Sequence, residues 1–193
     1  MHEIIVTEGV VLNKRPVGEA NTLVAILTRD LGLVRAKALS TRREGSKLRY
    51  GLEPLTVGRF SLVRGKQEWR LTGVEQVSRS LAACPHNGGR KRVAQVASLL
   101  LRLMPGAEPT PLLFKTVIQG FEIFAQTSDQ LSLDSIEVVL VLRILAHLGY
   151  LPETPALAPY VDGALTVELS AQALRDRSLL IKTINESLQA TGL

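Results

Sequence analysis

The sequence predicts two consecutive domains of different class, a five-stranded OB-fold barrel followed by an all-α helical bundle. In residues 1–80, short β-branched and aromatic runs are separated by turn residues, with no helical period. From residue 90 onward the apolar residues recur at helical spacing. Residues 1–80 also hold 14 Lys and Arg against 8 Asp and Glu, whereas residues 81–193 hold 9 against 10. We therefore expect a basic β domain over 1–80 and a near-neutral helical domain over 81–193.

Five short strands are expected in the first domain. The segment between the first two contains Pro16 and Gly18 and is expected to be a loop over 13–21, and Gly9 is expected to mark a bulge or bend. Arg64-Gly65-Lys66 has the composition of a hairpin. Five short strands at this spacing favour a small closed or nearly closed barrel of the OB type. The strands are predicted at 3–12, 22–28, 33–39, 55–63 and 67–77.

The segment Arg29–Arg49 is the most basic part of the chain, with seven Lys and Arg against two acids. Val34, Ala36 and Ala38 alternate with Arg35 and Lys37, a pattern that predicts a strand with an apolar inner face and a cationic outer face. A polar, basic loop follows over 40–51. Such a surface suits a polyanion backbone; the alternative is a strand edge kept soluble by its charges. The candidate nucleic-acid-binding cations of the barrel are Lys14, Arg15, Arg35, Lys37, Arg42, Arg43, Lys47 and Arg49.

Three aromatic residues of the first domain are candidates for base stacking. Tyr50 lies between Arg49 and Gly51 at the end of the basic loop and is the preferred candidate. Trp69 is expected to pack on the barrel, with stacking on a base as the alternative. Phe60 alternates with polar neighbours and is expected in the core.

The second domain is expected to begin after a linker at 78–89, which contains Pro85 and two glycines. Thr110-Pro111 resembles a helix start, Asp134 with Glu137 a capping box, and Gly149 a helix C-cap. Three prolines between 152 and 159 exclude a long helix there. Helices are predicted at 90–104, 110–125, 136–148 and 170–190, the last with a break near Asp176-Arg177-Ser178.

The composition offers little for catalysis or metal binding. Cys84 is the only cysteine, and the three histidines lie far apart in the sequence. No P-loop, HExxH or GxSxG pattern is present. We therefore expect a binding protein with no cofactor and no metal. The N-terminus does not resemble a signal peptide, and the apolar run 136–148 is too short to span a bilayer, so a cytoplasmic protein without a membrane partner is expected.

Residues 9–77, which begin with a GxVL strand, resemble the amino-terminal domain of the RecO-type bacterial recombination mediators. The resemblance includes Gly18-Glu19, the Thr28-Arg29 turn with Gly32, the Arg42-Arg43 loop, Leu52 with Pro54-Leu55, and Arg64-Gly65. Leu142–Leu145 and Leu148-Gly149-Tyr150 resemble the helical part of the family. The resemblance implies an OB fold that binds single- and double-stranded DNA, anneals complementary strands and helps to load recombinase onto strands coated with single-stranded-DNA-binding protein. The same resemblance implies a cytoplasmic, nucleoid-associated protein. It also implies two partners, RecR and the acidic tail of the single-stranded-DNA-binding protein.

One departure from the family concerns its zinc module. Many relatives carry a four-cysteine zinc site after the Leu-Gly-Tyr segment, whereas residues 152–165 here contain no cysteine. The resemblance therefore implies a reduced second domain without zinc.

Two further binding sites are expected in the helical domain. For the partner tail, Arg143 with Phe121 and Arg102 would supply an apolar pocket and a cation; the alternative is that Arg143 snorkels from a core helix to water. Arg90, Lys91 and Arg92 would extend the DNA path, and the alternative is a solvated cluster.

Three hypotheses follow for the whole chain. The first is a non-enzymatic DNA-binding recombination mediator. The second is an OB-fold RNA-binding module without mediator activity. The third is a protein-interaction scaffold whose basic face docks an acidic protein.

Overall fold

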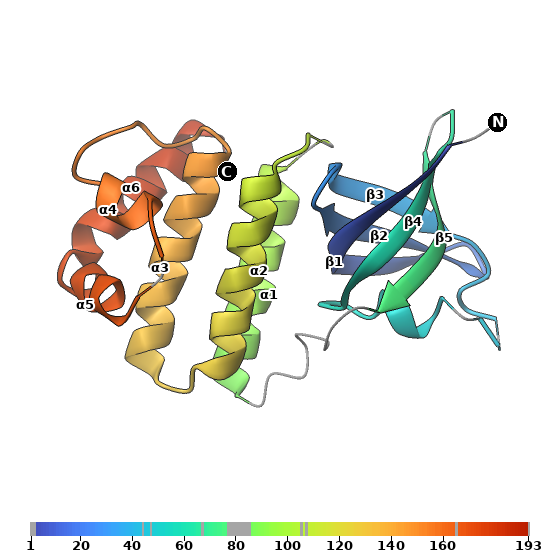
Figure 1. The fold of residues 1–193 in the computed structure, drawn as a ribbon, viewed down its shortest axis with the longest axis horizontal. Coiled ribbons are helices and arrows are strands. Elements are labelled where there is room, and N and C mark those ends of the chain that lie inside the picture. Colours follow the sequence, from blue (N-terminus) through green and yellow to red (C-terminus); the bar gives the residue numbers. More distant parts are fainter. Residues whose placement is uncertain are drawn as a thin grey trace. The chain divides into compact units, whose positions relative to one another are not determined.

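The computed structural model describes residues 3–192 apart from 44, 47, 67, 77–85, 105, 107 and 165. The chain divides into two compact units, one formed by residues 1–83 with 97–114 and the other by 84–96 with 115–193. A β-barrel comes first along the chain and helices follow it, as Figure 1 shows. The predicted class, a barrel followed by an all-α part, is confirmed. Most of the predicted linker, with Cys84, lies outside the described residues.

Five strands close into one barrel in the order β1-β2-β3-β5-β4. All neighbouring pairs are antiparallel except β3 and β5, which are parallel. A 3₁₀ turn, η1 (Tyr50–Leu52), lies between β3 and β4. This is the five-stranded closed barrel expected of an OB fold. The strands are β1 (Ile4–Val17), β2 (Asn21–Thr28), β3 (Gly32–Ala38), β4 (Val57–Arg64) and β5 (Trp69–Gln76).

The barrel interior is filled by the apolar alternate residues of the strands. Val34, Ala36 and Ala38 are fully buried, while Arg35 between them is exposed, so the predicted alternation of β3 is confirmed. Phe60 is fully buried, as expected. Trp69 packs against this core and lies beneath the guanidinium of Arg64, 5.8 Å from the ring centroid, which agrees with the expected packing role.

The first strand is longer than predicted. Residues 13–17 are not a loop but the second half of β1, paired with β2 up to Val17 opposite Asn21. Pro16 is tolerated because it lies near the strand end, where one missing N–H interrupts the ladder least. The register shift falls between Val11 and Asn13, so the bulge is not at Gly9. Gly9 instead pairs on both sides, and a Cβ there would lie 2.8 Å from a methyl of Ile26.

Six helices follow among the described residues, and most were predicted. The predicted start of α3, with Asp134 as the cap, was wrong. Asp129 caps the helix by accepting a hydrogen bond from the Ser132 amide at 2.8 Å, and Asp134 lies inside the helix. Gly149 at φ +74° ends α3, as expected. The helices are α1 (Asn87–Leu103), α2 (Pro111–Gln126), α3 (Gln130–His147), α4 (Ala158–Val161), α5 (Val167–Arg175) and α6 (Arg177–Ala190), with the predicted break at Asp176.

Helix α3 is the centre of the helical unit, and α4, α5 and α6 all pack against it. Its buried residues spread around much of its circumference, which is typical of a core helix. On α2, Gly120 allows a close approach, since a Cβ there would lie 2.5 Å from a methyl of Leu140. None of the described helices combines the length and the apolar character needed to cross a membrane.

Candidate nucleic-acid interface

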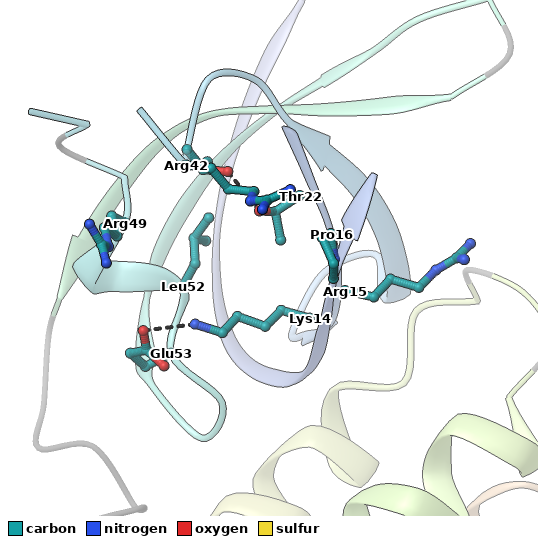
Figure 2. Close-up of a pocket in the computed structure, with 9 residues that line it drawn as sticks. Lys14, Arg15, Pro16, Thr22, Arg42, Arg49, Leu52 and Glu53 are labelled. Carbon is teal, nitrogen blue, oxygen red and sulfur yellow. Dashed lines mark hydrogen bonds and ion pairs between the residues drawn. The ribbon is translucent and has the colours of Figure 1, made fainter. Parts of the chain in front are cut away.

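A solvent-open pocket of about 400 Å³ lies on the barrel beside the β1–β2 hairpin. Its walls come from three segments that are distant in the sequence: the end of β1 with the start of β2, the basic loop after β3, and the turn around η1 (Figure 2). The lining residues are Lys14, Arg15, Pro16, Thr22, Thr41, Arg42, Arg49, Leu52 and Glu53. We call this the basic pocket.

Hydrogen bonds fix the first part of the basic loop to the β1–β2 hairpin. The hydroxyls of Thr22 and Thr41, both buried, are 2.7 Å apart. The Ser40 amide donates to Oδ1 of Asn21 at 3.0 Å, and the Arg42 amide donates to the Ala20 carbonyl at 3.1 Å. These bonds hold the arginine-bearing loop in place before any ligand arrives, which lowers the entropic cost of binding.

Positive charge dominates the basic pocket. Four cations line it, and Glu53 is the single acid among its lining residues. Lys14 forms an ion pair with Glu53, with 2.7 Å between Nζ and Oε1, and Figure 2 shows the two side chains extended toward each other. Arg42 donates from Nη1 to the Gly18 carbonyl at 3.2 Å. Within the part of the chain that the structure describes, no carboxylate lies within 4 Å of the guanidinium groups of Arg15, Arg42 or Arg49.

The basic pocket continues into an adjoining hollow on the same unit. Lys14 and Arg15 line both, and Arg35 joins them in the second. Arg35 projects from the outer face of β3 and donates from Nη2 to the Leu101 carbonyl at 3.3 Å. Lys37 leaves the same face of β3 but is paired with Glu68, with 3.6 Å between Nζ and Oε1. The structure therefore brings Arg35 to the cationic surface and partly neutralises Lys37.

Tyr50 follows Arg49 of the basic pocket in the sequence and has 80% of its area exposed. Its neighbours Gly51 and Leu52 are buried, and they anchor η1 to the barrel. A Cβ on Gly51 would lie 2.3 Å from a methyl of Val74, so the turn approaches β5 closely. The anchored turn therefore presents the Tyr50 ring to solvent. Arg43 is also exposed, but it does not line the basic pocket, and Lys47 is outside the described residues.

Of the three cations at the start of α1, Arg92 differs from the expectation. Arg92 is 9% exposed and forms ion pairs with Asp134 and with Glu137, the latter at 2.7 Å between Nε and Oε2. We therefore remove Arg92 from the predicted DNA path, because its charge is already paired inside the helical unit. Arg90 donates to Oδ1 of Asn87 at 2.6 Å, and Lys91 is exposed.

Arg143 does not reach water as the snorkelling alternative required. It is 5% exposed, and it donates from Nε to the Tyr160 carbonyl at 2.8 Å and from Nη2 to the Asp162 carbonyl at 3.4 Å. Burial lowers the pKa of Arg143, and Asp162 opposes that shift. Phe121 is fully buried, and the exposed Arg102 belongs to the other compact unit. We therefore do not assign the partner tail to these three residues.

Comparison with known proteins identifies the family. Residues 1–79 match the family described as "Recombination protein O N terminal". DNA repair protein RecO of Heliobacterium modesticaldum is 34% identical over 150 residues, which cover 76% of this chain and 52% of that protein. The chain belongs to the RecO family.

Two further RecO relatives match to a similar extent. DNA repair protein RecO of Synechococcus sp. (strain JA-2-3B'a(2-13)) is 30% identical over 163 residues, covering 77% of this chain and 55% of that protein. DNA repair protein RecO of Thermodesulfovibrio yellowstonii is 29% identical over 153 residues, which cover 76% of this chain and 58% of that protein. The chain thus spans a little over half the length of these RecO relatives.

Five residues that line the basic pocket in this RecO-family barrel were not predicted as site residues from the sequence: Pro16, Thr22, Thr41, Leu52 and Glu53. Thr22 and Thr41 resemble ordinary strand and loop residues, and Glu53 resembles a solvated acid. Nothing in their local sequence signals the pocket, because the barrel closure brings together segments that are distant along the chain. Among the residues that the structure describes, no group of three or more His, Cys, Asp and Glu is placed to hold a metal ion.

Proposed function

We propose that this RecO-family chain is a DNA-binding recombination mediator that acts in recombinational DNA repair without catalysing a reaction. In this proposal it anneals complementary single strands and assists the loading of recombinase. The DNA-binding domain is residues 1–80, and residues 81–193 form its helical partner domain. Family membership supports the repair function, and the basic pocket on the OB barrel is the observation that supports DNA binding.

The proposed mechanism is electrostatic. Lys14, Arg15, Arg42 and Arg49 line one pocket and would contact several consecutive phosphates of a strand. Neutralising those phosphates lowers the repulsion between two strands that approach to pair. Because these groups contact the backbone and not the base edges, we expect a weak sequence preference. The exposed ring of Tyr50, next to Arg49 in the sequence, would supply a surface on which one base can stack.

Two protein partners belong to the proposal on the strength of the family resemblance. They are RecR and the acidic, Phe-ended tail of the single-stranded-DNA-binding protein. We assign no surface to either partner, since the residues expected to receive the tail are buried or lie on different units. We propose that the chain acts in the cytoplasm with the nucleoid.

The test is an annealing assay with two complementary labelled oligonucleotides, run bare and coated with the single-stranded-DNA-binding protein. Wild type should accelerate pairing under both conditions, and Arg42→Ala with Arg49→Ala should lose most of the acceleration. A control variant, Arg59→Ala with Arg70→Ala, removes the same charge from barrel positions outside the basic pocket. Equal losses in the two double variants would mean that net charge, and not the basic pocket, is responsible.

Competition with RNA separates this proposal from the RNA-binding alternative. We expect unlabelled DNA to displace a labelled DNA strand better than RNA of the same sequence does. Equal or stronger displacement by RNA would favour the RNA-binding module. Absence of binding to either at physiological salt would favour the protein-interaction scaffold.

A further inference from the structure

The acid inside the basic pocket is its least expected member. Glu53 carries a carboxylate among four cations and forms its ion pair with Lys14. A phosphate entering the pocket would need the same cation. Both side chains are partly open to solvent, with 33% of Lys14 and 56% of Glu53 exposed, so the pair is accessible to exchange.

The backbone holds Glu53 in place while its side chain remains free to move. The Glu53 carbonyl accepts a hydrogen bond from the Thr56 amide at 3.1 Å, and the Leu55 amide donates to the Val11 carbonyl of β1 at 2.7 Å. The preceding residue, Leu52, is buried in the barrel. The backbone of Glu53 is therefore fixed on this turn, and a rotation of its side-chain torsions alone would release Lys14.

We propose that Glu53 is a built-in competitor for phosphate, a carboxylate that holds Lys14 until a polyanion displaces it. This inference rests on the proposed function and adds the regulation of the same pocket. Exposed ion pairs are weak, so a ligand that contacts Arg42 and Arg49 at the same time can break the pair with Lys14. A single phosphate lacks those additional contacts. The competitor thus favours polynucleotides over mononucleotides and inorganic phosphate.

Glu53→Gln is the direct test because it keeps the size of the side chain and removes its charge. Binding is measured by the anisotropy of a fluorescein-labelled thymidine 30-mer. We expect the variant to bind about two- to fivefold more tightly than wild type, the range that corresponds to one exposed ion pair. Because the bound strand contacts Lys14 in both proteins, the slope of log affinity against log salt should not steepen in the variant. Glu75→Gln makes the same charge change at an exposed barrel position outside the pocket and should alter affinity by less than half as much.

A double-mutant cycle with Lys14→Met shows whether Glu53 acts through Lys14. If it does, Glu53→Gln should improve binding much less in the Lys14→Met background than in wild type. An equal gain in both backgrounds would overturn the inference, since Glu53 would then act by general repulsion. No gain in affinity from Glu53→Gln would also overturn the inference. A loss of affinity confined to oligonucleotides that contain guanine and cytosine would overturn it too, because Glu53 would then contact bases.

The same titration keeps the two proposals apart. If Arg42→Ala with Arg49→Ala weakens binding while Glu53→Gln changes nothing, the DNA-binding pocket stands and the competitor role fails. If the wild-type chain does not bind the oligonucleotide, the proposed function fails and the competitor role fails with it.

Discussion

Arg143 provides a sharp test of how the helical unit is held together. It lies on α3 and donates to the carbonyls of Tyr160 and Asp162 at 2.8 and 3.4 Å, which ties the segment containing α4 to the core helix. Tyr160 is itself 1% exposed, and its hydroxyl is 2.5 Å from Oδ2 of Asp176. Arg143→Met keeps much of the length of the side chain but leaves both carbonyls without this donor.

The expected cost follows from those contacts. A hydrogen bond from a charged donor contributes about 1.5–3 kcal/mol, and the longer second bond contributes less. Relief of the buried charge offsets part of this, so we expect a loss of about 2–3 kcal/mol in the free energy of unfolding. As a control, Arg102→Met at an exposed position should change the free energy of unfolding by less than about 0.5 kcal/mol.

Urea denaturation followed by circular dichroism gives the free energy, and amide exchange of residues 157–176 reports the local effect. Exchange in that segment should accelerate strongly in Arg143→Met. A free-energy change equal to that of Arg102→Met would show that the two carbonyl contacts do not stabilise the unit.

Two further predictions concern Tyr50 and Glu137. Tyr50→Ala should weaken single-strand binding by about 1–3 kcal/mol without changing the melting temperature, because the ring is 80% exposed. Tyr50→Phe should retain binding in the same anisotropy titration, and a loss as large as that of Ala would argue against stacking. Burial raises the pKa of Glu137 despite the nearby Arg92, so its contribution to stability is largest below the unfolded pKa and falls as pH rises through the folded one. In parallel urea titrations, the free energy of unfolding of Glu137→Gln should therefore rise relative to wild type as pH rises through that window, and a difference that stays constant with pH would contradict the prediction.

The barrel was predictable because its signal is local. Alternation over β3 determines which residues face the core, so the sequence pattern alone places Arg35 on the outer face. The end of β1 was predicted as a loop because Pro16 has no N–H to donate to a strand ladder. The residue is compatible with β1 because it lies near the end of the strand. The pocket itself was only half predictable, because Thr41 and Glu53 join it through chain closure and not through sequence pattern.

The helical half shows where residue type alone misleads. Asp134 has the sequence context of a helix cap, but it lies inside α3 as an ion-pair partner of Arg92, forty-two positions away. Arg143 has the pattern of a side chain that reaches water, but its acceptors are backbone carbonyls, which every residue carries and no sequence pattern marks. Both errors concern long-range pairing of a cation, which depends on tertiary packing.

The most direct test of the basic pocket is the salt dependence of single-strand binding. Removing one phosphate-binding cation should flatten the slope of log affinity against log salt by about 0.7. Arg42→Ala with Arg49→Ala should therefore flatten the slope by about 1.4, whereas Arg59→Ala with Arg70→Ala should change it by less than about 0.5. A slope unchanged in the pocket variant, or flattened equally in both, would contradict the assignment of phosphate binding to this pocket.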